Sequence, residues 1–184
     1  MNVSSHGAST LFEFRRHIMI VFHASTLTIE KPLIMNRFKT LDFGTGFYTT
    51  TNEDQAQDFA RKVYFRRGRI GTPTVNVYEF DTEKAQNSLE FLEFKSPDEL
   101  WLDFVVNNRR HGRSDECNAN VIIGPVANDD VFETIALYES GQIDKDIAIK
   151  RFKVKSLFDQ ILFCDDKALD YIRFITSYAL EVPK

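Results

Sequence analysis

Cysteine is scarce in this sequence. The chain of 184 residues contains only Cys117 and Cys164, which lie far apart and belong to no Cys-x-x-Cys pair or Cys/His cluster. A structural zinc site needs about four ligands of this kind. The sequence therefore predicts no metal site and two ordinary reduced thiols.

Long apolar runs are also missing. No stretch approaches the ~20 apolar residues that a membrane-spanning helix requires. Near the N-terminus, Glu13, Arg15 and Arg16 interrupt the region where a secretory signal would need an unbroken apolar segment. These absences predict a cytoplasmic protein with no membrane partner.

An excess of positive charge is absent too. The net charge is −4 and the isoelectric point is about 5.6, whereas a general nucleic-acid binder is usually basic overall. The composition that remains, 43% hydrophobic and 27% charged, is typical of a globular domain. We find no repeat or linker, so we predict an N-terminal tail without regular structure at residues 1–17 and one domain at residues 18–184. Met1 and Met19 are alternative translation starts.

Strand signals recur along the domain. Segments rich in β-branched and aromatic residues predict strands at residues 18–23, 47–50, 74–80, 89–94, 120–123 and 158–163. The chain has seventeen Phe, and those within these segments, such as Phe91, Phe94 and Phe163, are expected in the core.

Helix signals fall between the strands. Asn52 and Gln55 have the spacing of a capping box before a helix that runs to about residue 67, and Ser96 resembles an N-cap before a second helix. Their predicted buried faces are Ala56, Phe59, Ala60 and Val63 in the first helix, and Leu100, Trp101, Phe104 and Val105 in the second.

Further helices are expected after residue 128, ended by Gly141, and at residues 144–151. Asp165 is positioned to cap a C-terminal helix whose core face is Ala168, Leu169, Ile172 and Phe174. Because strands and helices do not alternate regularly, the predicted fold class is α+β.

Polar groups gather at the ends of three predicted strands. Residues 21–26 read Val-Phe-His-Ala-Ser-Thr, residues 44–50 read Gly-Thr-Gly-Phe-Tyr-Thr-Thr, and residues 158–163 read Phe-Asp-Gln-Ile-Leu-Phe. A strand with His, a Gly-x-Tyr strand leading into a helix, and a third strand headed by an acidic or amide residue resemble the His–Tyr–Glu class of ADP-ribosyltransferases. That class includes the poly(ADP-ribose) polymerases and diphtheria toxin.

Residues 19–174 also resemble a bacterial family with this fold, through the segments 22–26, 42–48, 124–130 and 159–160. Its members are often toxins of toxin–antitoxin or phage-defence loci. The resemblance implies an ADP-ribosyltransferase-like split β-sandwich with flanking helices, NAD as a substrate, a cognate antitoxin, and a protein or nucleic-acid acceptor.

The resemblance also implies site residues. His23 would bind a ribose hydroxyl, Tyr48 would stack on nicotinamide, and Gly44 and Gly46 would allow the backbone to approach NAD. Ser25 and Thr26 complete the predicted cofactor-binding set. Each has a structural alternative: a satisfied histidine, a core tyrosine and turn glycines.

Gln160 stands where the wider class usually has Glu, and an amide cannot supply the negative charge of a carboxylate. Either the amide suffices for catalysis, or Asp129 or Asp130 brings the charge. These two aspartates can equally serve as a helix cap.

Basic clusters follow two of the predicted helices: Arg61, Lys62, Arg66, Arg67 and Arg69 in one, and Arg109, Arg110, His111 and Arg113 in the other. They either compensate helix dipoles or form a groove for a phosphate-bearing target. The predicted function is an NAD-dependent ADP-ribosyltransferase. The alternatives are an inactive module that binds NAD, ADP-ribose or a protein, an NAD glycohydrolase, or a phosphotransferase acting on RNA ends.

Overall fold

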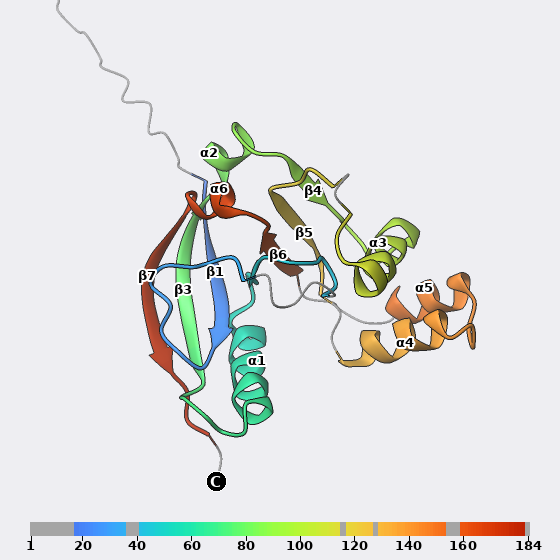
Figure 1. The fold of residues 1–184 in the computed structure, drawn as a ribbon, viewed down its shortest axis with the longest axis horizontal. Helices are drawn as coiled ribbons and strands as arrows, with labels where there is room; N and C mark the ends of the chain where they lie inside the picture. Colours follow the sequence, from blue (N-terminus) through green and yellow to red (C-terminus); the bar gives the residue numbers. More distant parts are fainter. Residues whose placement is uncertain (1–16, 36–40, 115–116, 127–128, 154–158, 183–184) are drawn as a thin grey trace, which may run out of the picture.

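The computed structural model describes residues 17–35, 41–114, 117–126, 129–153 and 159–182, with the side chains of residues 129–132 and 153 excepted. It contains two β-sheets with helices against them (Figure 1). The predicted α+β class is therefore confirmed. The predicted tail falls outside the described residues except for His17.

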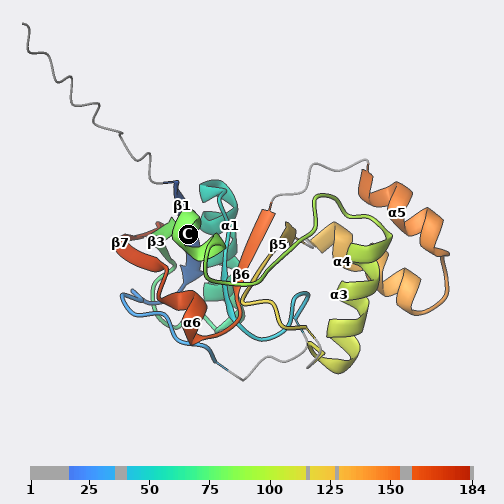
Figure 2. The ribbon, with the colours of Figure 1, turned by 90° about the horizontal axis from the view of Figure 1, so that it is seen from above.

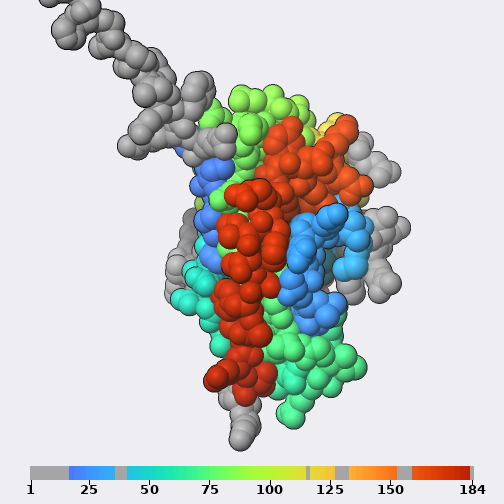
Figure 3. All heavy atoms as spheres, turned by 90° about the vertical axis from the view of Figure 1, so that its left-hand side faces the viewer, coloured from blue at the N-terminus to red at the C-terminus, as the bar shows by residue number. Residues whose placement is uncertain are grey.

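The first sheet has the strand order β1-β3-β7 and is antiparallel throughout. Its strands are β1 (Ile18–Ser25), β3 (Thr74–Asp81) and β7 (Ile172–Ala179). Helix α1 (Glu53–Arg66) covers part of one face, where Ala56 and Ala60 pack against Val75 and Val77 of β3. On the edge seen in Figure 3, β7 lies beside the segment after β1, and the hydroxyls of Thr28 and Ser177 are 2.8 Å apart.

The second sheet has the order β2-β6-β5-β4. It consists of β2 (Phe47–Thr49), β6 (Asp159–Phe163), β5 (Val121–Pro125) and β4 (Phe91–Glu93). Strands β4 and β5 are parallel, and the crossover between them contains helix α3 (Glu99–His111).

Apolar side chains fill both sides of the second sheet. Between the sheets, Phe80 meets Phe163 edge to face at 4.9 Å. The opposite face packs against α3, α4 (Asp129–Glu139) and α5 (Lys145–Lys153), with the fully buried Trp101 against Phe152 (Figure 2). The second sheet is therefore the central layer of the molecule.

Two backbone hydrogen bonds join the sheets. The Phe22 amide donates to the Thr50 carbonyl at 2.8 Å, and the Thr50 amide donates to the Phe22 carbonyl at 3.0 Å. We call this junction of β1, Thr50 and β6 the seam. The short helices α2 (Thr82–Gln86) and α6 (Asp166–Leu169) lie near the opposite end of β1 (Figure 1).

The predicted C-terminal helix is wrong beyond Leu169. Asp165 does cap a helix, since its carboxylate accepts from the Ala168 amide, but α6 ends after four residues. Ile172 and Phe174 belong instead to β7, which pairs with β3. Pairing with a central strand satisfies the backbone of this β-branched and aromatic segment, and it overrides the local helix signal.

Other local predictions need smaller corrections. The N-cap of α3 is Asp98 rather than Ser96, because the Asp98 carboxylate accepts from the Trp101 amide at 3.1 Å. Phe59 and Leu100 were expected in buried faces, yet both are exposed. The Asn52 cap of α1 is confirmed, with the Gln55 amide donating to it at 2.7 Å. Among the described helices, none combines the length and apolar character needed to cross a membrane.

Candidate functional site

The seam brings the three predicted polar strand ends together. Thr50 pairs with Phe22 of β1 on one side, and its hydroxyl lies 2.8 Å from the Asp159 carbonyl of β6 on the other. Since neighbouring strands are spaced by about 4.8 Å, β1 and β6 run about 10 Å apart here. Thr50 occupies the interval between them, so the seam holds the two strands in a fixed relation.

His23 has a fixed orientation at the seam. Its Nδ1 lies 2.7 Å from the Tyr48 carbonyl, and its ring stacks on Phe47 with 4.3 Å between centroids. A carbonyl only accepts hydrogen bonds, so Nδ1 must carry a proton. Burial lowers the pKa of His23 to about 4, against the opposing effect of this hydrogen bond. The ring is therefore neutral at pH 7, and Nε2 presents a lone pair that can accept a hydrogen bond.

Gln160 is buried, with 7% of its surface exposed, and its Nε2 atom has no hydrogen-bond partner among the described residues. Buried polar atoms are nearly always paired, so this amide nitrogen is a candidate hydrogen-bond donor to a bound molecule. Gln160 lies two residues from Leu162, which pairs with Tyr48. Gln160 and Tyr48 therefore point to the same face of the sheet, whereas the His23 ring stacks on Phe47, which points to the opposite face.

Both the side chain and the backbone carbonyl of Tyr48 form hydrogen bonds. Its hydroxyl donates to the Gly44 carbonyl at 2.6 Å and accepts from the Phe43 amide at 3.2 Å. Burial raises the pKa of this phenol. The Tyr48 side chain thus fixes the glycine turn and its carbonyl fixes His23, while stacking on nicotinamide stays a prediction.

Packing explains why both predicted site glycines, Gly44 and Gly46, are glycine. Gly44 adopts a φ of +83°, and a Cβ there would lie 2.7 Å from the Arg113 Cβ. A Cβ on Gly46 would overlap the Leu162 side chain and lie 2.5 Å from the Phe163 carbonyl oxygen. Both positions require glycine for packing alone, so their proximity to a ligand stays a prediction.

Ser25 and Thr26 are both engaged within the fold. The Ser25 hydroxyl accepts from the Leu27 amide at 3.3 Å, and the Thr26 hydroxyl accepts from Arg67 at 2.9 Å. Both residues are buried. These bonds shape the turn after β1 and anchor the end of α1.

The expected alternative carboxylates are not placed at the site. Asp129 and Asp130 are the first residues of α4, but their side chains lie outside the described residues. The carboxylate that sequence reasoning missed is Asp159, which accepts from the Thr51 amide at 3.2 Å and the Thr51 hydroxyl at 2.7 Å. Its position directly before Gln160 was the available signal.

A family comparison covers this whole arrangement. Residues 19–174, from β1 into β7, match the model of a family described as a protein of unknown function (DUF3990). The chain belongs to the DUF3990 family. No curated protein and no solved structure matches it. The matched region includes His23, Tyr48 and Gln160, so the seam lies inside the part that defines DUF3990.

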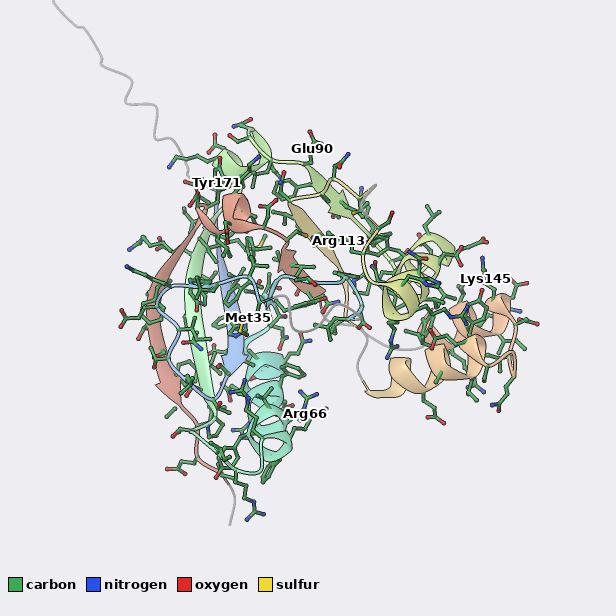
Figure 4. All side chains as sticks on the ribbon, in the orientation of Figure 1. Met35, Arg66, Glu90, Arg113, Lys145 and Tyr171 are labelled. Atoms are coloured by element: carbon green, nitrogen blue, oxygen red, sulfur yellow. The ribbon has the colours of Figure 1, made fainter. Side chains whose placement is uncertain are left out.

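A second polar cluster in this DUF3990 chain lies beyond the glycine turn. Asp42 and Arg109 form an ion pair at 3.6 Å, and burial raises the Asp42 pKa while Arg109 opposes the shift. Arg113 lies between the second sheet and α3 (Figure 4) and contacts Cys164, whose pKa burial raises to about 12. Next to this cluster is an open cavity of about 720 Å³ with a polar lining: Thr45, Asn107, His111, Gly112, Arg113, Ser114 and Cys117. The cavity does not include His23, Tyr48 or Gln160.

Proposed function

We propose that this protein is an NAD-dependent ADP-ribosyltransferase of the His–Tyr–Glu class. The observation that carries the proposal is the hydrogen bond from His23 to the Tyr48 carbonyl, which leaves a neutral imidazole with an accepting Nε2 at the seam. A ribose hydroxyl is the kind of donor that such an atom binds. The two sheets, packed through Phe80 and Phe163, support the finer proposal of an ADP-ribosyltransferase-like split β-sandwich.

The proposed reaction breaks the bond between nicotinamide and ribose. The bonding electron pair leaves with nicotinamide, positive charge develops on the sugar, and a lone pair of the acceptor forms the new bond as the acceptor proton passes to water. The protein accelerates this step by holding the ribose rigidly. His23 accepts from one ribose hydroxyl. Gln160 and Tyr48 point to the other face of the second sheet, so their proposed contacts, the amide with a ribose oxygen and the ring with nicotinamide, require the ligand to extend round the edge of β2.

Gln160 also supports a second candidate, a catalytically inactive module that binds NAD, ADP-ribose or a protein. An amide orients the ribose but does not stabilise the charge on it. Asp159 is the nearest described carboxylate in sequence, yet successive residues of a strand point to opposite faces, so it lies on the other side from Gln160. In the transferase, the charge comes from Asp159 or from the Asp129/Asp130 pair.

The biological setting follows from the resemblance described above. We propose a cytoplasmic toxin of a toxin–antitoxin or phage-defence system, restrained by a cognate antitoxin, that modifies a protein or nucleic acid. Expression of the chain alone is then expected to arrest bacterial growth, and Gln160→Ala is expected to relieve the arrest.

The decisive experiment measures both binding and turnover of NAD. Calorimetry gives the affinity of the purified chain, and labelled NAD incubated with cellular protein, RNA and DNA fractions reports transfer. Gln160→Ala is expected to lower turnover by about 10²-fold, the effect of removing one positioned hydrogen-bond group. Gln160→Glu is expected to retain or raise turnover, and Gln142→Ala, in an exposed turn, serves as the matched control.

Each outcome decides between the candidates. Binding without turnover in any fraction favours the inactive module. The absence of NAD binding at millimolar ligand overturns the transferase and the NAD-binding form of the module.

A further inference from the structure

The C-terminal half of α1 exposes large aromatic rings. Phe59 and Phe65 are 49% and 45% exposed, and Ile70 beyond the helix is 73% exposed. The buried side of the helix is formed by Ala56 and Ala60 instead. These rings therefore contribute little to the core, and about half of each ring is exposed to solvent.

Cations accompany the rings. The Arg66 guanidinium carbon lies 5.0 Å from the centre of the Phe59 ring, and that of Arg69 lies 5.6 Å from the centre of Phe65. Figure 4 shows Arg66 on the side of α1 away from the first sheet. Neither arginine forms an ion pair with a carboxylate in the part of the chain that the structure describes. We call Phe59, Lys62, Phe65, Arg66 and Arg69 the α1 patch.

The backbone after α1 is unusual. Gly68 and Arg69 both have positive φ, at 67° and 65°. Glycine adopts this conformation freely, but an arginine rarely does. This turn places the Arg69 guanidinium carbon 5.6 Å from the centre of the Phe65 ring.

We infer that the α1 patch is a docking surface for single-stranded nucleic acid. Bases can stack on the exposed rings in place of the arginines, and the displaced guanidinium groups, which have no ion pair among the described residues, then bind the phosphates. The Arg66 guanidinium carbon is 5.0 Å from the centre of the Phe59 ring, so the base and the phosphate of one nucleotide can contact this pair together. An acidic peptide would use the cations but would have no use for the ring faces.

The patch is consistent with the net charge of −4, because the charge is segregated along α1. Glu53 and Asp54 occupy the first turn, whereas the cations gather at the other end. The first turn directly follows the seam. The docking surface is therefore confined to the end of α1 away from the seam, because Glu53 and Asp54 would repel a phosphate backbone at the first turn.

The test is fluorescence anisotropy of labelled 12-nucleotide oligo-dT and oligo-rU with the full chain, without NAD, at several salt concentrations. The double change Arg66→Ala/Arg69→Ala is expected to weaken binding at least tenfold and to reduce the salt slope by about 1.4, or 0.7 for each lost phosphate contact. Phe65→Ala is expected to weaken binding about tenfold with an unchanged slope. Lys84→Ala, an exposed cation on α2, is the control and is expected to stay within twofold.

Three results would overturn the inference: no binding by the wild type, an equal loss in Lys84→Ala, or equal competition by a polyglutamate peptide. The last would assign the patch to an acidic protein. Because the assay contains no NAD, a failed transferase proposal leaves it intact, and a failed docking proposal leaves NAD cleavage intact.

Discussion

Helices α1 and α3 have similar sequence patterns, but the cations at their C-terminal ends have different partners in the structure. Each begins at a capped N-terminus and ends in a cluster of cations. At the end of α3, Arg109 pairs with Asp42 and Arg110 with Glu139. At the end of α1, Arg66 and Arg69 lie over exposed rings instead.

The difference comes from what packs against each helix. Helix α3 lies between the glycine turn and α4, which supply the carboxylates Asp42 and Glu139. The exposed half of α1 has no comparable neighbour among the described elements. The ion-paired cations at the end of α3 therefore stabilise the fold. Arg66 and Arg69 at the end of α1, which have no ion pair among the described residues, are available to bind another molecule.

The largest effect on stability is expected at the end of α3, where the cations form ion pairs. Arg109→Ala removes the cation from a largely buried Asp42 carboxylate, and we expect the free energy of unfolding to fall by about 3 kcal/mol. Urea unfolding followed by circular dichroism measures the change. Arg109→Lys, which keeps the charge, is the control and should recover part of the loss. A loss below about 1 kcal/mol in Arg109→Ala contradicts the comparison.

His23 is intermediate between these groups, because Nδ1 is hydrogen-bonded to the Tyr48 carbonyl and Nε2 can still accept a hydrogen bond. Its pKa is about 4 in the folded chain and 6.5 in a free side chain. Between these values the unfolded chain binds a proton that the folded chain does not, so stability is complete above pH 6.5 and falls as the pH drops toward 4. From pH 7.5 to pH 5 we expect a loss of about 2 kcal/mol beyond that of His23→Gln. Equal pH dependence of the two proteins would show that burial does not hold His23 neutral.

Thr26 tests a hydroxyl that the fold already uses. Thr26→Val keeps the shape and removes the acceptor for Arg67, and we expect a loss of about 1 kcal/mol in urea unfolding. NAD affinity by calorimetry should not change, because the Thr26 hydroxyl is engaged with α1. A weaker NAD affinity with unchanged stability would restore the predicted role of Thr26 in the cofactor site.

The smallest effect on stability is expected at the C-terminal end of α1. Arg66→Ala removes a cation with no carboxylate partner among the described residues, so stability should change by less than about 0.5 kcal/mol. Differential scanning calorimetry of this variant beside Arg109→Ala makes the comparison direct. A loss as large as that of Arg109→Ala would mean that both clusters are structural.

The sequence alone predicted what depends on near neighbours. Asn52 caps α1 because its side chain reaches an amide three residues away, and β3 matches its predicted segment within one residue. Local spacing also predicted a helix after Asp165 that included Ile172. That part of the prediction is wrong, because Ile172 begins β7 and pairs with β3.

Only the tertiary structure decided which polar groups are satisfied. The sequence marked His23, Tyr48 and Gln160 as site residues. It did not show that the Tyr48 carbonyl fixes the His23 tautomer, or that the Gln160 amide nitrogen is buried with no partner among the described residues. Likewise, nothing in the two basic clusters distinguished Arg109 from Arg66. Hydrogen bonds and ion pairs between residues far apart in the chain depend on how the sheets and helices pack, which local spacing does not encode.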